Sequence, residues 1–199
     1  MSRGAAAVLF GEALVDDFGG AEVVGGAPFN VARHLAAFHV PQLMITRVGS
    51  DDAGRRVRAE FERFGMADDG LQADLSLPTG RVLVREGLDG HTFTILPHQA
   101  YDAIDAALAV QALATVDPAL LYFGTLAQRA APSRGALSAL LDATPVPRFL
   151  DLNLRDGQVD ERRVFASLQA ADVVKVNEDE LQSLFGWYVQ GAPAGAEQG

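Results

Sequence analysis

The chain has 199 residues, of which 49% are hydrophobic and 21% are charged, which is the size and balance of one ordinary soluble domain. Its 26 acidic side chains outnumber its 16 basic ones and give a net charge of −10. Nucleic acids and anionic membranes attract proteins with a basic surface, so the charge argues against both as partners. The chain has no cysteine, which excludes disulfides and thiolate metal sites.

No uninterrupted apolar run reaches the ~20 residues that a membrane span needs. The apolar run at 5–10 is short and ends at Gly11-Glu12, so it is typical of a buried strand rather than of a signal peptide. We therefore expect the protein in the cytoplasm.

Predicted strands and helices alternate along the chain. Apolar runs predict strands, and apolar residues spaced three and four apart predict helices. The predicted elements, in chain order, are strand 5–10, helix 29–38, strand 43–48, helix 54–64, helix 103–115, strand 120–123, helix 133–143, strand 148–152, helix 164–170, strand 173–176 and helix 178–185. Such alternation predicts an α/β domain over 1–189, with a mostly parallel sheet covered by helices on both faces.

The first helices have clear apolar faces. Val31, Leu35 and Phe38 should form the inner face of helix 29–38. In helix 54–64 the inner residues should be Val57, Phe61 and Phe64, and Asp51 or Asp52 is a plausible cap.

Two segments depart from the alternation. Residues 81–86 and 91–96 alternate apolar and polar side chains around Asp89-Gly90, which predicts a hairpin at a sheet edge or in a small side sheet. Residues 190–199 lack periodicity and have almost nothing to bury, so we expect a disordered tail.

The segment Gly25-Gly26-Ala27-Pro28-Phe29-Asn30 leads directly into a predicted helix. Glycines let the backbone come close to a ligand, the proline suits the first turn of a helix, and Asn30 offers both a donor and an acceptor. We interpret the segment as one wall of a site for a small polar ligand. The alternative is a loop-to-helix junction with ordinary turn glycines.

Asp16 is predicted to stand at the end of the first strand, where the ligand crevice of a parallel sheet lies. A carboxylate there could accept hydrogen bonds from two hydroxyls of a polyol. The alternatives are a loop aspartate that caps a turn, and a register in which Asp17 takes this place.

Polar side chains alternate with leucines in Asp151-Leu152-Asn153-Leu154-Arg155. In an extended chain Asp151, Asn153 and Arg155 would point to one side, and Arg155 could bind a phosphate or a carboxylate. A structural Asp–Arg pair explains the pattern equally well.

The segment Lys175-Val176-Asn177-Glu178-Asp179-Glu180 follows the last predicted strand. Asn177 followed by Glu180 is typical of a helix capping box. It also suits an anion or Mg²⁺ site, since helix N-termini bind anions and Mg²⁺ prefers oxygen ligands and water. Both roles can hold together.

These motifs, in this order, resemble the PfkB (ribokinase-like) family of ATP-dependent sugar kinases, and its fructokinase branch above all. The resemblance runs from about residue 8 to about residue 186 and also rests on Arg47-Val48-Gly49-Ser50-Asp51-Asp52-Ala53-Gly54. It implies a ribokinase-like fold, transfer of the ATP γ-phosphoryl group to a sugar hydroxyl, and ATP and Mg²⁺ as cofactors.

The resemblance also implies roles for individual residues. Sugar-binding positions would be Asp16, Gly25, Gly26, Asn30, Asp151, Asn153 and Arg155. Lys175, Asn177 and Glu180 would help to place phosphate and Mg²⁺, mostly through water. A small β lid, from about 17–25 and 79–97, would close over the sugar and exclude water, and a homodimer through this lid is one option.

One motif of the family is missing. The base that activates the sugar hydroxyl comes, by the resemblance, from a Gly-Ala-Gly-Asp motif whose glycines also bind the transferred phosphate. The 199 residues contain no such motif, so no catalytic residue is identified and the ribokinase-like fold is expected to be incomplete at its C-terminal side.

Two hypotheses follow. The chain is a sugar kinase recorded without its ATP side, or it is a natural short homologue that binds a sugar or regulates a partner without catalysis. The sequence favours the first, because a shortened parallel sheet exposes an edge that the tail does little to protect. The sugar itself is not fixed by the sequence, although Arg155 favours an anionic group on it.

Overall fold

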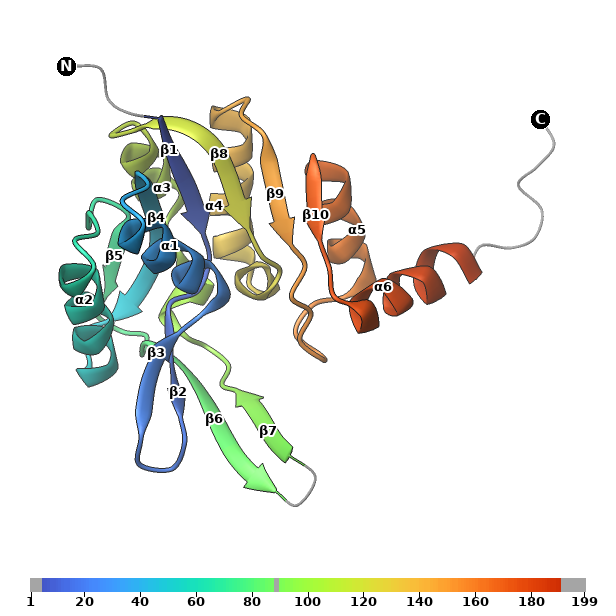
Figure 1. Cartoon of the computed structure of the whole chain (residues 1–199), viewed down its shortest axis with the longest axis horizontal. Helices are drawn as coiled ribbons and strands as arrows, with labels where there is room; N and C mark the ends of the chain where they lie inside the picture. The colour runs from blue at the N-terminus through green and yellow to red at the C-terminus, as the bar shows by residue number, and fades with distance from the viewer. Residues whose placement is uncertain (1–4, 88–89, 191–199) are drawn as a thin grey trace.

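The computed structural model describes residues 5–87 and 90–190 (Figure 1). The predicted tail, 190–199, lies outside the described residues except for its first residue.

The larger sheet has six strands in the order β10-β9-β8-β1-β4-β5, and all its neighbouring strands are parallel. Its strands are β1 (Ala5–Phe10), β4 (Gln42–Gly49), β5 (Leu71–Asp74), β8 (Asp117–Phe123), β9 (Arg148–Asp151) and β10 (Val173–Lys175). This arrangement confirms the predicted α/β fold with a mostly parallel sheet.

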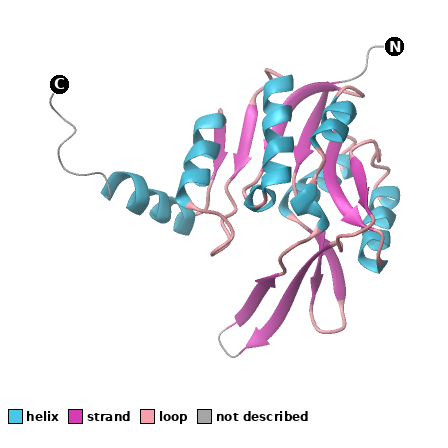
Figure 2. Ribbon diagram, turned by 180° about the vertical axis from the view of Figure 1, so that it is seen from behind, coloured by secondary structure: helices cyan, strands magenta, loops and turns pink. Residues whose placement is uncertain are grey.

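Helices cover both faces of this sheet. The helices α1 (Ala27–Ala37) and α2 (Asp52–Arg63) lie on one face. On the other face lie α3 (Ala106–Leu113), α4 (Ala131–Ala143) and α5 (Glu161–Ala170), which are in front in Figure 2. Strand β1 serves both layers, because Val8 and Phe10 pack with the second group of helices while Ala7 and Leu9 pack with the first.

A second, four-stranded sheet projects from one end of the molecule (Figure 1). It has the order β3-β2-β6-β7, with β2 (Leu14–Asp17), β3 (Glu22–Gly25), β6 (Gly80–Gly87) and β7 (Gly90–Ile95). Strands β6 and β7 are antiparallel, as the alternation predicted, although Asp89 of the predicted turn lies outside the described residues.

The placement of Asp16 on the first strand is wrong. Strand β1 ends at Phe10, and Asp16 lies in β2 of the second sheet. The chain leaves the first sheet at Gly11, whose φ of 144° is a conformation that side chains rarely adopt.

Two helix predictions need correction. Helix α1 buries Phe29 and Ala32, whereas Phe38 follows the helix and is 78% exposed. The predicted helix 103–115 is two elements, the 3₁₀ turn η1 (Ala100–Ala103) and α3. They are separate because Asp105 is extended and caps α3, accepting a hydrogen bond from the Leu108 N–H.

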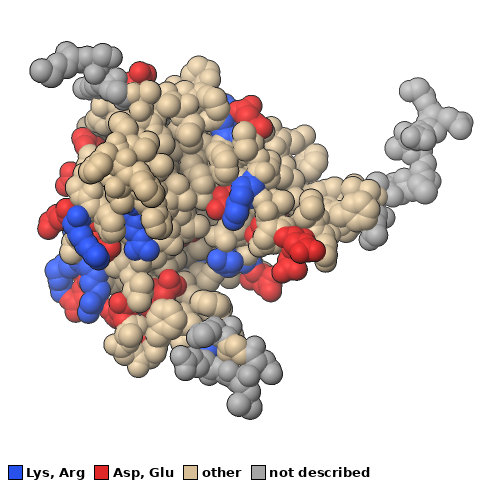
Figure 3. Space-filling model, in the orientation of Figure 1, with Lys and Arg blue, Asp and Glu red and all other residues tan. Residues whose placement is uncertain are grey.

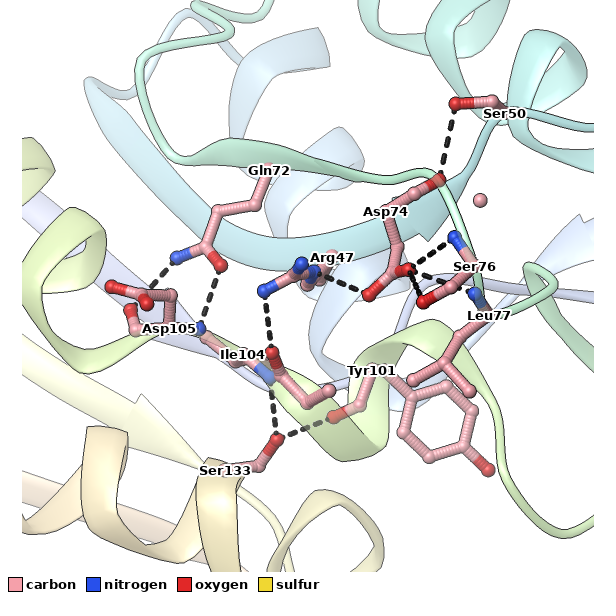
Figure 4. Close-up of polar contacts among 12 residues, drawn as sticks. Arg47, Ser50, Gln72, Asp74, Ser76, Leu77, Tyr101, Ile104, Asp105 and Ser133 are labelled. Carbon is pink, nitrogen blue, oxygen red and sulfur yellow. Dashed lines mark hydrogen bonds and ion pairs between the residues drawn. The ribbon is translucent and has the colours of Figure 1, made fainter.

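The link from β7 to α3 is fixed to the main sheet by polar contacts (Figure 4). Arg47 on β4 makes an ion pair with Asp74 on β5, with Nε and Oδ2 2.9 Å apart. Arg47 also donates to the carbonyl of Ala103 at 2.8 Å, and Ser133 Oγ accepts from the Ile104 N–H at 2.9 Å. These contacts hold the segment between η1 and α3 against the main sheet and α4.

The described chain ends in α6 (Glu178–Phe185) and the π turn η3 (Gly186–Gln190), which run away from the sheet (Figure 1). Acidic side chains gather where α6 begins (Figure 3), a favourable place for negative charge. Over α2, basic and acidic side chains are interspersed.

Candidate functional site

A cleft of about 510 Å³ lies where the second sheet meets the carboxyl ends of the main strands. This is the usual place for a ligand in an open parallel sheet. The predicted residues that line it are Asp16, Gly26, Asn30, Asp151, Asn153, Arg155 and Lys175. Gly25, Asn177 and Glu180 are not among its lining residues.

A larger hollow, of about 840 Å³, lies at the opposite end of the strands, beside Ala6 and Gln42. None of the predicted site residues lines it.

Two glycines allow one wall of the cleft to form. A Cβ on Gly25 would lie 2.6 Å from Asp16 Oδ2. Gly26 has φ 110°, and a Cβ there would lie 2.5 Å from the carbonyl oxygen of Glu12. Close approach of the β1–β2 loop to the start of α1 therefore requires glycine, and Gly25 contributes by packing behind Asp16 rather than by lining the cleft.

The two neighbouring aspartates on β2 have different surroundings. Asp16 lines the cleft and is half-buried, and this burial raises its pKa while the positive charge of Arg155 opposes the rise. Asp17 instead makes an ion pair with Arg81, at 2.7 Å. Of the two neighbouring aspartates, Asp16 is therefore the one that can contact a ligand.

The end of β9 brings further polar groups into the cleft. Asp151 Oδ2 accepts from the Tyr122 hydroxyl at 2.7 Å, and Oδ1 lies 2.9 Å from Lys175 Nζ. Burial, followed by the hydrogen bond to Asp151, raises the pKa of Tyr122. Asp151 is thus already paired on both oxygens.

The residues directly after β9 are irregular rather than extended, and a turn follows at 156–158. The alternation predicted for an extended chain nevertheless holds at Leu152. Leu152 is fully buried, whereas Asn153 lines the cleft with φ 40°. That left-handed conformation is one that asparagine tolerates better than most residues. Arg155 is exposed at the cleft and lowers the pKa of both Asp16 and Glu12.

Asn177 and Glu180 form a complete capping box. Asn177 Oδ1 accepts from the Glu180 N–H at 2.8 Å, and Glu180 Oε2 accepts from the Asn177 N–H at 2.9 Å. Glu180 Oε1 accepts from the Leu154 N–H at 2.8 Å, and the side chain is buried. These oxygens are committed to backbone donors and do not fit direct ligation of Mg²⁺, so we derive no step through that ion.

Sequence reasoning missed Glu12. This side chain lines the cleft although it is only 2% exposed. Its Oε1 accepts from the Ala27 N–H, the first residue of α1, at 3.1 Å. Burial raises its pKa to about 7. The available signal was an acidic residue directly after the glycine that ends a buried strand.

Within the part of the chain that the structure describes, no three His, Asp or Glu side chains lie together as metal ligands. None of the helices in residues 5–87 and 90–190 has the length and apolar character that crossing a bilayer requires.

Residues 9–188 match the pfkB family carbohydrate kinases. The chain therefore belongs to the PfkB family of carbohydrate kinases.

Two plant fructokinases are among the chain's relatives. Fructokinase-1 of Oryza sativa subsp. japonica is 30% identical over 173 residues, and Fructokinase-1 of Zea mays is 28% identical over 171. Each match covers 81% of this chain and 53% of the relative. The chain thus spans about half the length of these relatives.

Solved structures share the fold. An uncharacterized sugar kinase of Pyrococcus horikoshii, in complex with ATP, has a TM-score of 0.81 at 24% identity and covers 92% of this chain and 66% of its own. A Vibrio cholerae fructokinase double mutant with fructose, ADP and potassium ion has a TM-score of 0.76 at 25% identity, covering 94% of this chain and 64% of its own.

Proposed function

We propose that this chain forms the sugar-binding part of an ATP-dependent sugar kinase, of the fructokinase type, which transfers the ATP γ-phosphoryl group to a sugar hydroxyl. The observation that carries the proposal is the cleft, which gathers polar residues from β2, α1, β9 and β10 at one end of the parallel sheet. The fructokinase relatives support fructose as the first sugar to test.

The acceptor side of the cleft suits sugar hydroxyls. The Asp16 carboxylate and the Asn30 amide come from β2 and α1 and line the same space. A carboxylate can accept hydrogen bonds from two hydroxyls, and an amide can both donate and accept. Close packing of Gly25 and Gly26 against the β1–β2 loop and β2 sets the position of this wall.

The cleft also contains positive charge. Arg155 and Lys175 both line it, and Lys175 also pairs with Asp151. We propose that these cations meet an anionic group, either on the sugar or on the phosphoryl donor. Asn177 and Glu180 then contribute by fixing the start of α6, beside Lys175.

The second sheet is proposed to act as a lid. Val82, Phe93 and Ile95 line the cleft from β6 and β7. Their apolar side chains would cover a bound sugar and keep water from competing for the phosphoryl group. We also propose that two copies of the chain pair through their lids as a homodimer.

A binding-only function is the second candidate. It rests on the side chains that line the cleft, which can hold hydroxyls and anions without a phosphoryl donor. Such a protein would hold a sugar in the same cleft without transferring phosphate.

Two measurements on the purified 199-residue chain separate the candidates. One is the shift in melting temperature with a panel of sugars, with and without ATP and Mg²⁺. The other is ADP release under the same conditions. A kinase gives a shift with at least one sugar and also releases ADP, whereas the binding-only protein gives the shift alone. No shift with any sugar would contradict both.

A further inference from the structure

Glu12 has one carboxylate oxygen that no donor of the described chain reaches with full hydrogen-bond geometry. Its Oε1 accepts from the Ala27 N–H at 3.1 Å, whereas its Oε2 is buried and has no hydrogen-bond partner among the described residues. A buried acceptor without a partner is costly, and native structures rarely keep one without a reason.

A second unused acceptor lies on the same wall. Asn30 Oδ1 is also buried without a partner among the described residues, and Asn30 and Glu12 both line the cleft. Asn30 stands one turn along α1 from Ala27, to which Glu12 is bonded. The cleft therefore has two acceptors that lack donors, and a ligand hydroxyl is the simplest group that supplies a donor there.

The charged groups around Glu12 come from several elements. Burial has the largest effect on its pKa and raises it, and hydrogen bonds from its own N–H and from the Ala27 N–H lower it. Arg155 lowers the pKa and Asp151 raises it by smaller amounts. The titratable and charged groups that share the cleft or act on the carboxyl electrostatically are Asp16, Asp151, Arg155, Lys175, Tyr101 and Tyr122.

We propose that Glu12 is a specificity-determining residue whose Oε2 accepts a hydrogen bond from one hydroxyl of the bound sugar, beside Asn30. The inference rests on the proposed sugar-binding function. It adds Glu12 to the residues that contact the sugar and states which sugars the site rejects. A sugar that lacks this hydroxyl leaves a buried acceptor unpaired and is rejected, because sites built around a hydroxyl discriminate strongly against its absence. The competing role is a purely structural one, in which Glu12 only caps α1.

The variant Glu12→Gln separates the two roles. Its amide oxygen can still accept from the Ala27 N–H, while its NH₂ group replaces the acceptor at Oε2 with a donor. We expect the variant to fold with a melting temperature no lower than that of wild-type chain, and the affinity for D-fructose, measured by titration calorimetry, to fall at least about tenfold. Glu62→Gln, which removes the same charge from an exposed position on α2, is the matched control and keeps the wild-type affinity.

A set of monodeoxy-fructoses identifies the hydroxyl. One of them should bind the wild-type chain at least about tenfold more weakly than D-fructose, and this penalty should disappear in Glu12→Gln. A penalty of the same size in both proteins would show that Glu12 does not contact that hydroxyl, and equal penalties throughout the set would overturn the inference.

The pH dependence of binding gives a readout that needs no variant. An ionised Glu12 is the better acceptor, so the affinity of wild-type chain for D-fructose should rise as the pH passes through about 7. A flat profile from about pH 6 to about pH 8 overturns the inference even if the variant does not fold.

The outcomes distinguish the inference from the proposed function. If wild-type chain binds D-fructose and Glu12→Gln binds it with unchanged affinity, the proposed function is supported and Glu12 only caps α1. Wild-type chain that binds neither D-fructose nor any other sugar of the panel overturns both.

Discussion

At the scale of single residues, the cleft depends on side chains that are buried at a cost. Glu12 is withdrawn from solvent with one oxygen unused, and Asp16 is half-buried beside it in the cleft. Burial disfavours the charged form of a carboxyl, so these groups make the empty protein less stable than it could be. Binding sites commonly carry such unfavourable groups, because their partners arrive with the ligand.

Glu12 should make stability depend on pH. Its pKa is raised from 4.5 to about 7 in the folded chain. Below about pH 4.5 the carboxyl is protonated in both the folded and the unfolded chain, and Glu12 does not lower the free energy of unfolding. As the pH rises to about 7 the unfolded state ionises first, so the free energy of unfolding falls, by an amount on the order of 3 kcal/mol.

Urea unfolding at a series of pH values measures this effect. The side chain of Glu12→Gln stays neutral at every pH. The free energy of unfolding of this variant should therefore exceed that of wild-type chain by an amount that grows between about pH 4.5 and about pH 7 and then levels off. Glu62→Gln should follow the wild-type profile. Parallel profiles for Glu12→Gln and wild type would show that the carboxyl is not perturbed.

The sequence could single out Asp16, Asn30 and Arg155 because each stands in a short motif of polar residues or glycines, where local pattern is informative. It could not predict the role of Glu12, which arises from contact with Ala27, fifteen positions away. Nor could it show that the oxygens of Glu180 are occupied, because one of their donors is the N–H of Leu154, from another segment.

At the scale of elements, most helices and the strands β1, β4, β8, β9 and β10 were predictable, whereas β2, β3 and β5 were not. Strands β2, β3 and β5 have four residues each and lie outside the regular alternation of strands and helices that marked the others. Asp16 was consequently assigned to the end of β1. Strand β2 belongs to the second sheet through its pairing with β6, sixty-odd positions along the chain. The local sequence pattern around β2 does not indicate a pairing over that distance.

The junction between β3 and α1 should tolerate substitution poorly. Gly26 has a positive φ and a Cβ there would meet the backbone of Glu12, so Gly26→Ala should lower the free energy of unfolding by at least about 2 kcal/mol. It should also weaken sugar binding, because Ala27 and Asn30 shift with the start of α1.

Gly135→Ala is the matched comparison. Gly135 lies in α4 with open space where its Cβ would be, so alanine should stabilise the chain by about 0.5–1 kcal/mol. Chemical unfolding of the two variants tests both expectations. Equal effects of the two substitutions would mean that the close approach at Gly26 is not required.

At the scale of the whole molecule, one end of the sheet is poorly covered. Strand β10 lies at the edge, and its Val173 and Val174 are 49% and 39% exposed. On α6, Leu181 and Phe185 are 57% and 50% exposed. An exposed apolar edge strand favours pairing with another chain, which agrees with the unprotected edge that the sequence predicted.

The 199-residue chain should therefore self-associate as its concentration rises. Val173→Lys should reduce the association by placing a charge on the edge strand. Leu108→Lys, at a side chain of similar exposure on α3, should not. Light scattering measures the average mass, and a wild-type mass of 21.1 kDa at every concentration would contradict the prediction.

The most direct test of the account is calorimetric titration of the chain with D-fructose, in parallel with Asp16→Asn and Asp17→Asn. The two substitutions remove the same charge from adjacent residues, of which only Asp16 lines the cleft. We predict binding by wild type and Asp17→Asn, and an affinity at least about tenfold lower for Asp16→Asn. Equal binding by all three proteins would place the sugar elsewhere and contradict the proposed site.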